Sequence, residues 1–205
     1  ALLGPRQSGK TTLARETFPN HAFISFDNDI ERDLAKREPE RFLKLYENAY
    51  GIIIDEFQYV PRLMSYIKIE IDARRRPGYF IMTGSENFLM NQAITESLAG
   101  RVGILNLFPL SLSELAVNNL LTASVDEVIF KGGYPSVYYE DLDIKQFYPG
   151  YIQSYVERDV RQLINADNVD TFKLFIQLCA GRIGSVLNIE ALCSDVGITF
   201  GTARR

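Results

Sequence analysis

The chain has 205 residues, 46% of them hydrophobic and 23% charged, with a formal net charge of −4 at pH 7. This mix is typical of a globular protein with a core of its own, and the negative charge argues against a chain that coats nucleic acid without specificity. Its apolar runs are too short to cross a bilayer and its two cysteines too few for a disulfide scaffold, so we expect a cytoplasmic protein.

The chain opens on a motif for binding phosphate. Apolar residues 1–3 precede Gly-Pro-Arg-Gln-Ser-Gly-Lys-Thr-Thr, whose spacing of four residues between the glycines, followed by Lys-Thr, is that of a P-loop. The glycines let backbone N–H groups turn toward phosphates, and the following helix directs its positive end at them. We expect Lys10 to reach the β- and γ-phosphates of ATP and the Thr11 hydroxyl to bind Mg²⁺. The predicted nucleotide-binding residues are Gly4, Pro5, Arg6, Gln7, Ser8, Gly9, Lys10, Thr11 and Thr12.

The first half of the chain alternates short apolar runs with amphipathic stretches. We predict strands at 1–3, 22–26, 51–55, 79–83 and 102–107, and helices at 10–17, 30–48, 61–74 and 87–98. Such an alternation predicts an α/β fold, a P-loop NTPase parallel sheet with helices on both faces.

Two carboxylates end the strand predicted at 51–55. Asp55 is expected to bind Mg²⁺, and Glu56 to orient and deprotonate the attacking water. We expect this strand to neighbour the first one. The strand after it ends in small hydroxyl residues, and either Thr83 or Ser85 could sense the γ-phosphate or position the water. Solvated strand ends and a plain helix cap are the structural alternatives.

Several arginines follow. Arg101, at a predicted helix end, could neutralise charge at a γ-phosphate in its own site or in a neighbour's, or could only cap the helix. Action in a neighbour's site would require self-association. Arg158 and Arg161 are interpreted as members of an ion network on a helix surface, with an arginine finger as the less favoured alternative.

From residue 109 onward the pattern becomes helical. Ser111 and Ser124 each begin a capping-box sequence, and helices are predicted at 144–164 and 169–179. Residues 187–199 read as a helix and a turn at Gly197, and Thr199 caps a second helix. This is the pattern of a truncated helix-turn-helix. DNA contact through Thr202, Arg204 and Arg205 stays open but is not favoured, because residues 151–205 carry no basic excess. We predict an ATPase domain at 1–108, a helical linker or lid at 109–150, and an incomplete helical domain at 151–205.

The motifs together resemble the prokaryotic AAA-superfamily ATPases that carry a C-terminal domain of unknown function. The resemblance rests on the P-loop segment, Ile-Ile-Ile-Asp-Glu-Phe-Gln (52–58), Met-Thr-Gly-Ser (82–85), Ser-Leu-Ala-Gly-Arg (97–101), Phe-Pro-Leu-Ser-Leu-Ser-Glu-Leu (108–115), Gly-Gly-Tyr-Pro (132–135) and Tyr-Val-Glu-Arg-Asp-Val (155–160). It implies an ATPase domain, then helices and a winged-helix-like unit, and a longer C-terminal portion than is present here. Phe57 departs from the smaller or aliphatic residues usual at its position.

Three functions remain open after the sequence is read. The first is an ATPase that couples hydrolysis to motion of its helical part, which Glu56 favours because a pure binder needs no base. The second is a slow nucleotide-gated switch, and the third a DNA-binding regulator. The chain contains no Asn/Thr-Lys-x-Asp motif for guanine, which favours ATP over GTP. We also expect a fragment, since residues 1–3 read as the end of a strand and 199–205 as the start of a helix.

Overall fold

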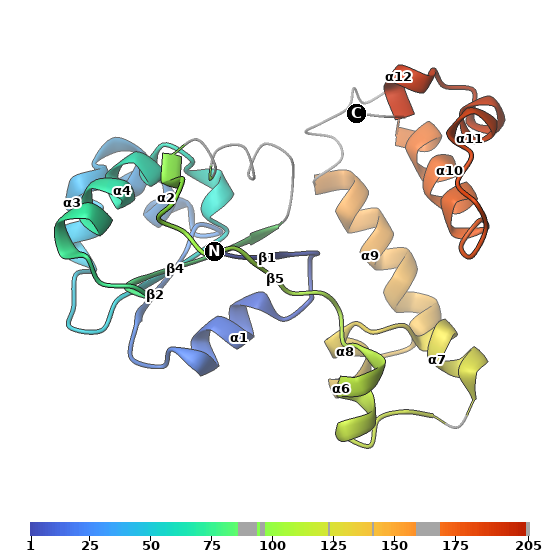
Figure 1. Ribbon diagram of the computed structural model, residues 1–205, viewed down its shortest axis with the longest axis horizontal. Helices are drawn as coiled ribbons and strands as arrows, with labels where there is room; N and C mark the ends of the chain where they lie inside the picture. Colours follow the sequence, from blue (N-terminus) through green and yellow to red (C-terminus); the bar gives the residue numbers. More distant parts are fainter. Residues whose placement is uncertain (86–93, 95–96, 123, 141, 159–168, 204–205) are drawn as a thin grey trace. The chain divides into compact units, whose positions relative to one another are not determined.

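The computed structural model describes residues 1–85, 94, 97–122, 124–140, 142–158 and 169–203 (Figure 1). The chain forms two compact units, Ala1–Leu142 and Asp143–Arg205, each of which is described by itself. The three-part division predicted from sequence stays a prediction. None of the described helices combines the length and apolar character needed to cross a membrane.

A parallel sheet forms the centre of the first unit. Its strands are β1 (Leu2–Gly4), β2 (Ala22–Ser25), β3 (Ile52–Asp55), β4 (Phe80–Ser85) and β5 (Leu105–Asn106), in the order β2-β3-β4-β1-β5. All neighbouring strands are parallel. The predicted α/β class with a parallel sheet is confirmed.

The expected place of β3 beside the first strand is wrong. β4 lies between them, with Thr83 in register with Asp55 on one side and with Leu2 on the other. Sequence alone gives strands but not their order, because the order depends on which crossover helix packs on which face. The insertion of β4 has a consequence for the site, since it puts the hydroxyl of Thr83 beside the Asp55 carboxylate.

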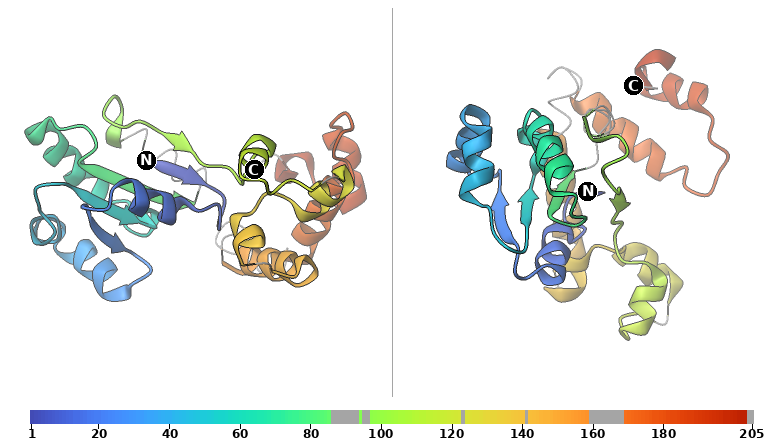
Figure 2. Two further views of the ribbon diagram at one scale, coloured as in Figure 1. Left: turned by 90° about the horizontal axis from the view of Figure 1, so that it is seen from below. Right: turned by 60° about the vertical axis from the view of Figure 1, so that its left-hand side comes forward.

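Helices cover both faces of the sheet. They are α1 (Lys10–Thr17), α2 (Asp29–Arg37), α3 (Pro39–Leu45) and α4 (Leu63–Arg74). In Figure 1, α1 lies on one face and α2, α3 and α4 lie on the other, and the view from below in Figure 2 shows α1 in front of the strands. The single helix predicted at 30–48 is wrong, because the chain breaks at Glu38, where Pro39 disfavours a helical predecessor. Most of the helix predicted at 87–98 lies outside the described residues.

The core of this unit fixes the end of β3. Ile52, Ile53 and Ile54 are each at most 1% exposed, so side chains on both faces of β3 are packed. Burying one such side chain contributes about 1.5–3 kcal/mol relative to leaving it in water. The strand is therefore held firmly up to Asp55. Its partners in the core include Leu3, Ile24, Phe26, Phe42, Leu63, Met64, Ile67 and Met82.

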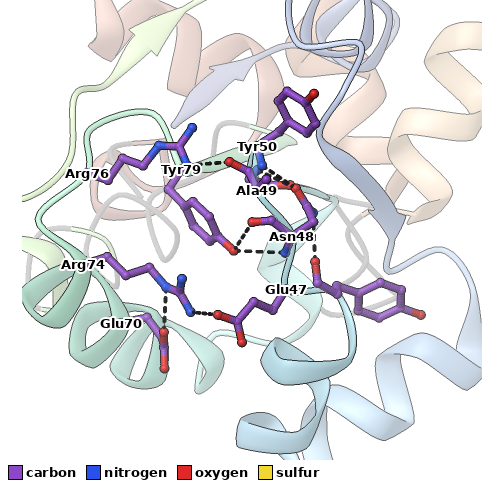
Figure 3. Close-up of polar contacts among 10 residues, drawn as sticks. Glu47, Asn48, Ala49, Tyr50, Glu70, Arg74, Arg76 and Tyr79 are labelled. Carbon is purple, nitrogen blue, oxygen red and sulfur yellow. Dashed lines mark hydrogen bonds and ion pairs between the residues drawn. The ribbon is translucent and has the colours of Figure 1, made fainter.

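A polar network fastens the opposite, amino edge of the sheet (Figure 3). The Asn48 side chain accepts from the Gly51 N–H at 2.9 Å and donates to the Gly51 carbonyl at 2.8 Å, which holds the start of β3. The Tyr79 hydroxyl, next to the start of β4, donates to the Asn48 carbonyl at 3.2 Å. Arg74 bridges Glu47 at 2.6 Å and Glu70 at 2.9 Å. The ends of α3 and α4 are thereby tied to the strand starts.

Short helices complete the first unit: α6 (Leu112–Val117), α7 (Val125–Lys131) and α8 (Pro135–Tyr139). The capping box expected at Ser111 is present with both of its hydrogen bonds, and the Ser124 hydroxyl accepts from the Glu127 N–H. The Leu107 N–H donates to the Leu3 carbonyl at 2.7 Å, so the segment that leads into these helices continues the sheet beyond β5.

The second unit is helical, as predicted. It contains α9 (Ile144–Arg158), α10 (Val169–Ala180), α11 (Ile189–Val196) and α12 (Phe200–Ala203). α11 ends at Gly197 in the left-handed conformation, and the Thr199 hydroxyl accepts from the Thr202 N–H at 3.2 Å, so the predicted helix, turn and capped helix are present. An ion pair between Arg182 and Asp195 joins the turn after α10 to α11. The predicted ion network of Arg158 and Arg161 and the DNA contacts of Arg204 and Arg205 involve side chains outside the described part.

Candidate nucleotide-binding site

The loop between β1 and α1 adopts backbone angles that suit glycine at both ends. Gly4 has φ +151°, and a Cβ there would lie 2.1 Å from the Leu107 carbonyl oxygen. Gly9 has φ +91° immediately before α1 begins at Lys10. Because L side chains rarely adopt such angles, the two glycines of the sequence motif are required by the loop's own geometry, whatever it binds.

The interior of this loop holds the Lys10 side chain. Lys10 is only 6% exposed, and its Nζ donates to the Pro5 carbonyl at 2.6 Å. The buried Ser8 hydroxyl donates to the same carbonyl at 2.9 Å. The ammonium group is thus held within the turn whose N–H groups were expected to surround phosphates. Thr12, by contrast, is exposed on α1.

Asp55, at the carboxyl end of β3, gathers three hydroxyl groups. Its Oδ1 accepts from Thr11 Oγ1 at 2.8 Å and also from Thr83 Oγ1, and its Oδ2 accepts from Ser25 Oγ at 3.2 Å. The structure therefore brings together three predicted residues from α1, β3 and β4. Ser25 was not predicted from the sequence. It ends β2 at the same edge of the sheet as Asp55, and a hydroxyl residue at the end of a predicted strand is the signal that could have identified it.

Glu56 follows Asp55 in the left-handed conformation, with φ 55° and ψ 39°. Its half-buried carboxylate accepts a hydrogen bond from Gln58 Nε2. Burial raises the pKa of Glu56, whereas the Gln58 hydrogen bond and the positive charge of Arg6 act in the opposite direction. The preceding residue, Asp55, accepts a hydrogen bond from Thr11, so Glu56 follows directly at the edge of the sheet where the P-loop lies.

Ser85 is placed differently from Thr83. It ends β4 in register with Gly4, and its hydroxyl is buried without a hydrogen-bond partner among the described residues. Thr83 is completely buried, and its hydroxyl donates to the Asp55 carboxylate. Thr83 is therefore part of the carboxylate cluster, while Ser85 stands beside the first residue of the P-loop.

Arg101 does not join these residues within its own chain. Its Nε and Nη2 contact the two oxygens of Asp72 at 2.6 and 3.1 Å, and its Nη1 donates to the Ala99 carbonyl at 3.2 Å. Asp72 lies near the end of α4, and Arg101 precedes β5, so the pair is at the amino edge of the parallel sheet. The P-loop and Asp55 occupy the carboxyl edge.

Two further segments of the sequence motifs pack on each other, and one of them reaches the P-loop. A Cβ on Gly9 would be 3.9 Å from Pro135 Cγ, and a Cβ on Gly133 would be 2.5 Å from the Leu110 carbonyl oxygen. The Leu110 N–H donates to the Gly133 carbonyl at 2.7 Å. The Phe-Pro-Leu and Gly-Gly-Tyr-Pro segments thus pack on each other, and the second reaches the loop at Gly9.

The residues present fit a magnesium ion. Mg²⁺ prefers oxygen ligands and is usually held by one or two carboxylates together with substrate phosphates. Asp55 and the Thr11 hydroxyl supply hard oxygen donors 2.8 Å apart next to the P-loop. Among the described residues, no three His, Cys, Asp or Glu side chains are grouped so that they could hold a metal ion.

The sheet, the loop between β1 and α1 and the carboxylates ending β3 define a P-loop NTPase-like α/β domain. A family model described as an AAA domain matches residues 1–116, which is more than half of the chain. The chain belongs to this AAA-domain family, whose fold implies nucleotide binding. Residues 122–205 match a second family, a domain of unknown function (DUF8612). The predicted resemblance is confirmed.

Three similar proteins are described as uncharacterized. Uncharacterized proteins of Mycobacterium tuberculosis and Mycobacterium bovis are each 30% identical over 206 residues, covering 100% of this chain and 45% of the relative. An uncharacterized protein of Haemophilus influenzae is 23% identical over 218 residues, covering 91% of this chain and 52% of the relative. The chain thus spans about half the length of these relatives.

Proposed function

We propose that this protein binds ATP with Mg²⁺ and hydrolyses it, and that hydrolysis changes the conformation of the helical part. The observation that carries the proposal is the 2.8 Å hydrogen bond between Thr11, on the first turn after the P-loop, and Asp55. It joins the phosphate-binding loop to the carboxylate pair at the end of β3. A domain that only holds a nucleotide does not need Glu56, the half-buried second member of that pair.

The residues of the chain divide the chemistry between them. The Lys10 ammonium and the P-loop N–H groups bind the phosphates, and Thr11 and Asp55 hold Mg²⁺, which would neutralise charge on the transferred phosphoryl group. Glu56 accepts a proton from water as the water oxygen bonds to the γ-phosphorus. The bond from that phosphorus to the bridging oxygen then breaks, and ADP leaves with the electron pair. Inorganic phosphate is the second product.

The proposal extends to Arg101 only in a neighbouring subunit. Its pairing with Asp72 at the amino edge of the sheet separates it from the nucleotide site of its own chain. A transition-state role would therefore require self-association and release of Asp72. Helix capping through the Ala99 carbonyl remains the alternative role.

The test compares Lys10→Ala and Glu56→Gln with the parent protein. Lys10→Ala should abolish ATP binding, because it removes the buried positive charge opposite the phosphates. Glu56→Gln should bind ATP normally and hydrolyse it roughly 10²–10⁴-fold more slowly, the usual contribution of a general base. Binding is measured by titration with a fluorescent ATP analogue and hydrolysis by phosphate release.

Glu40→Gln is the matched control, since Glu40 is an exposed glutamate on α3, away from the site. It should leave both measurements unchanged. A Glu56→Gln protein that turned over ATP at the parent rate would remove Glu56 as the base. A parent that bound ATP without hydrolysing it would instead support the slow nucleotide-gated switch.

A further inference from the structure

The turn that follows β3 brings the Gln58 side chain to the Glu56 carboxylate. After Glu56 the chain forms a single turn of 3-10 helix, η1 (Phe57–Tyr59). Phe57 is 2% exposed and anchors this turn in the core, and the Tyr59 N–H donates to the Glu56 carbonyl at 3.1 Å. The left-handed conformation of Glu56 is uncommon for a residue with a side chain, so the surrounding packing has to maintain it.

Gln58 holds one oxygen of the Glu56 carboxylate. A carboxylate only accepts hydrogen bonds, so the amide nitrogen of Gln58 faces it, and Nε2 donates to Oε2. The other amide atom, Gln58 Oε1, is buried and receives no hydrogen bond from the described residues. The contact therefore orients the carboxylate through one of its oxygens, Oε2.

Charged groups of both signs act on Glu56. Asp55 and Asp27 repel the carboxylate and Arg6 attracts it. The Gln58 hydrogen bond is a directional contact on this carboxylate, in addition to these charge interactions. A hydrogen bond to a charged group in a half-buried place is stronger than one between neutral groups. The Gln58 amide therefore binds the Glu56 carboxylate more strongly than it would bind a neutral acceptor.

We propose that Gln58 is a positioning residue that holds the Glu56 carboxylate in the orientation needed to accept a proton from water. The proposal rests on the proposed hydrolysis, because it assigns Gln58 a role only through Glu56. Gln58 itself is not placed on the substrate or on the reacting atoms.

The test is a double-mutant cycle with Gln58→Met, Glu56→Gln and the double variant. Met has nearly the length of Gln but no donor. Gln58→Met alone should lower kcat by about 10- to 10²-fold, the range seen when a reacting group is misplaced by about 1 Å, with KM within about twofold. In the Glu56→Gln background, Gln58→Met should change the rate by less than about twofold, because residues that act as one unit are not additive.

Gln146→Met, at an exposed position on α9, controls for the exchange of Gln for Met and should match the parent. The denaturation midpoints of the parent, Gln58→Met, Glu56→Gln and the double variant provide a measurement independent of hydrolysis. Gln58→Met should lower the midpoint more in the Glu56 background than in the Glu56→Gln background, because only the carboxylate loses a charge-assisted hydrogen bond.

Failure of this proposal is distinguishable from failure of the proposed function. If the parent hydrolysed no ATP, the proposed function would fail, and the cycle of denaturation midpoints would still show whether Gln58 acts on Glu56. Equal effects of Gln58→Met in both backgrounds, in rate or in midpoint, would overturn the positioning role. An effect confined to KM would overturn it as well.

Discussion

At Asp55, one carboxylate receives hydrogen bonds from hydroxyl groups on three different elements, α1, β2 and β4. A carboxylate that leaves water loses strong hydration, and these bonds offset that loss. The arrangement explains why an aspartate tolerates a position that is only 7% exposed. It also means that each hydroxyl contributes to the stability of the fold as well as to the site.

Thr83→Val tests this double role. Valine has the shape of threonine, so the substitution removes the hydroxyl donor and little else. We expect a loss of about 1–3 kcal/mol in the free energy of unfolding, the cost of removing a hydrogen bond to a buried charged group. Denaturant unfolding of the ligand-free protein measures it.

Thr17→Val is the matched control, at an exposed position in the last turn of α1, and should change the stability by less than about 0.5 kcal/mol. Equal stability of the Thr83→Val and parent proteins would show that Thr11 and Ser25 alone satisfy the carboxylate.

Sequence reasoning reached some of these residues and not others for a physical reason. Lys10, Asp55 and Glu56 stand in fixed spacing to glycines or at the end of an apolar run, and such positions can be read along the chain. Ser25 and Gln58 acquire their roles from the sheet order and from a short turn, which local patterns do not encode. Arg101 was predicted from a helix end, but its Asp72 partner lies 29 positions away in the sequence.

Among the elements, the breaks between helices were harder to predict than the apolar runs that form strands. Strands β2, β3 and β4 fall within about two residues of the apolar runs, since buried parallel strands are apolar throughout. The separation of α2 from α3 was missed although Pro39 marks it, because the amphipathic pattern continues across the break. The packing of the 107–110 segment on the 132–135 turn is a contact distant in sequence, and no pattern predicted it.

Gly133→Ala should destabilise this packing. An added Cβ would lie 2.5 Å from the backbone oxygen of Leu110, which cannot move away without disturbing the hydrogen bond between the two segments. Overpacking of this kind typically costs about 1–3 kcal/mol. Thermal or denaturant unfolding gives the loss, and a weaker affinity for ATP is expected with it, because Pro135 in the same turn lies against Gly9.

Gly103→Ala serves as the control, since nothing lies within 4 Å of a Cβ at that position. If the two alanine variants were equally stable, the close approach of the segments would be an incidental contact.

At the scale of the whole molecule, the chain matches two families, and what is known of their chemistry differs. The AAA domain implies a nucleotide, while the part matching residues 122–205 carries no described function. Arg101 lies at the edge of the sheet opposite the P-loop, so a role for Arg101 at a nucleotide depends on self-association. If Arg101 acts on a nucleotide, that nucleotide belongs to another copy.

Mixing experiments decide this point. Neither Arg101→Ala nor Lys10→Ala subunits should hydrolyse ATP well alone, because an arginine that acts in trans contributes about 10³–10⁵ in rate. A mixture should recover part of the activity, since Arg101→Ala subunits keep a working P-loop and Lys10→Ala subunits supply the arginine. The parent's rate per subunit should also rise with protein concentration.

Arg41→Ala, which removes an exposed arginine that pairs with Glu38 three residues earlier, is the single-variant control and should keep the parent rate. An Arg101→Ala protein within about twofold of the parent, at every concentration, would leave Arg101 with the Asp72 pair and the helix cap alone.

The network of Asn48, Arg74 and Tyr79 at the amino edge has a consequence for motion. Opening that edge requires several side-chain hydrogen bonds and an ion-pair bridge to break together, in addition to the sheet's own bonds. At the carboxyl edge, the turn at Glu56 is held chiefly by the burial of Phe57 and by a few local hydrogen bonds. Local opening follows the least costly set of contacts, so we expect amide hydrogen exchange to be faster in the turn after Glu56 than at the starts of β3 and β4. The Asp55 hydrogen bonds hold the strand end itself, so a rearrangement of this turn would leave the register of the strands unchanged.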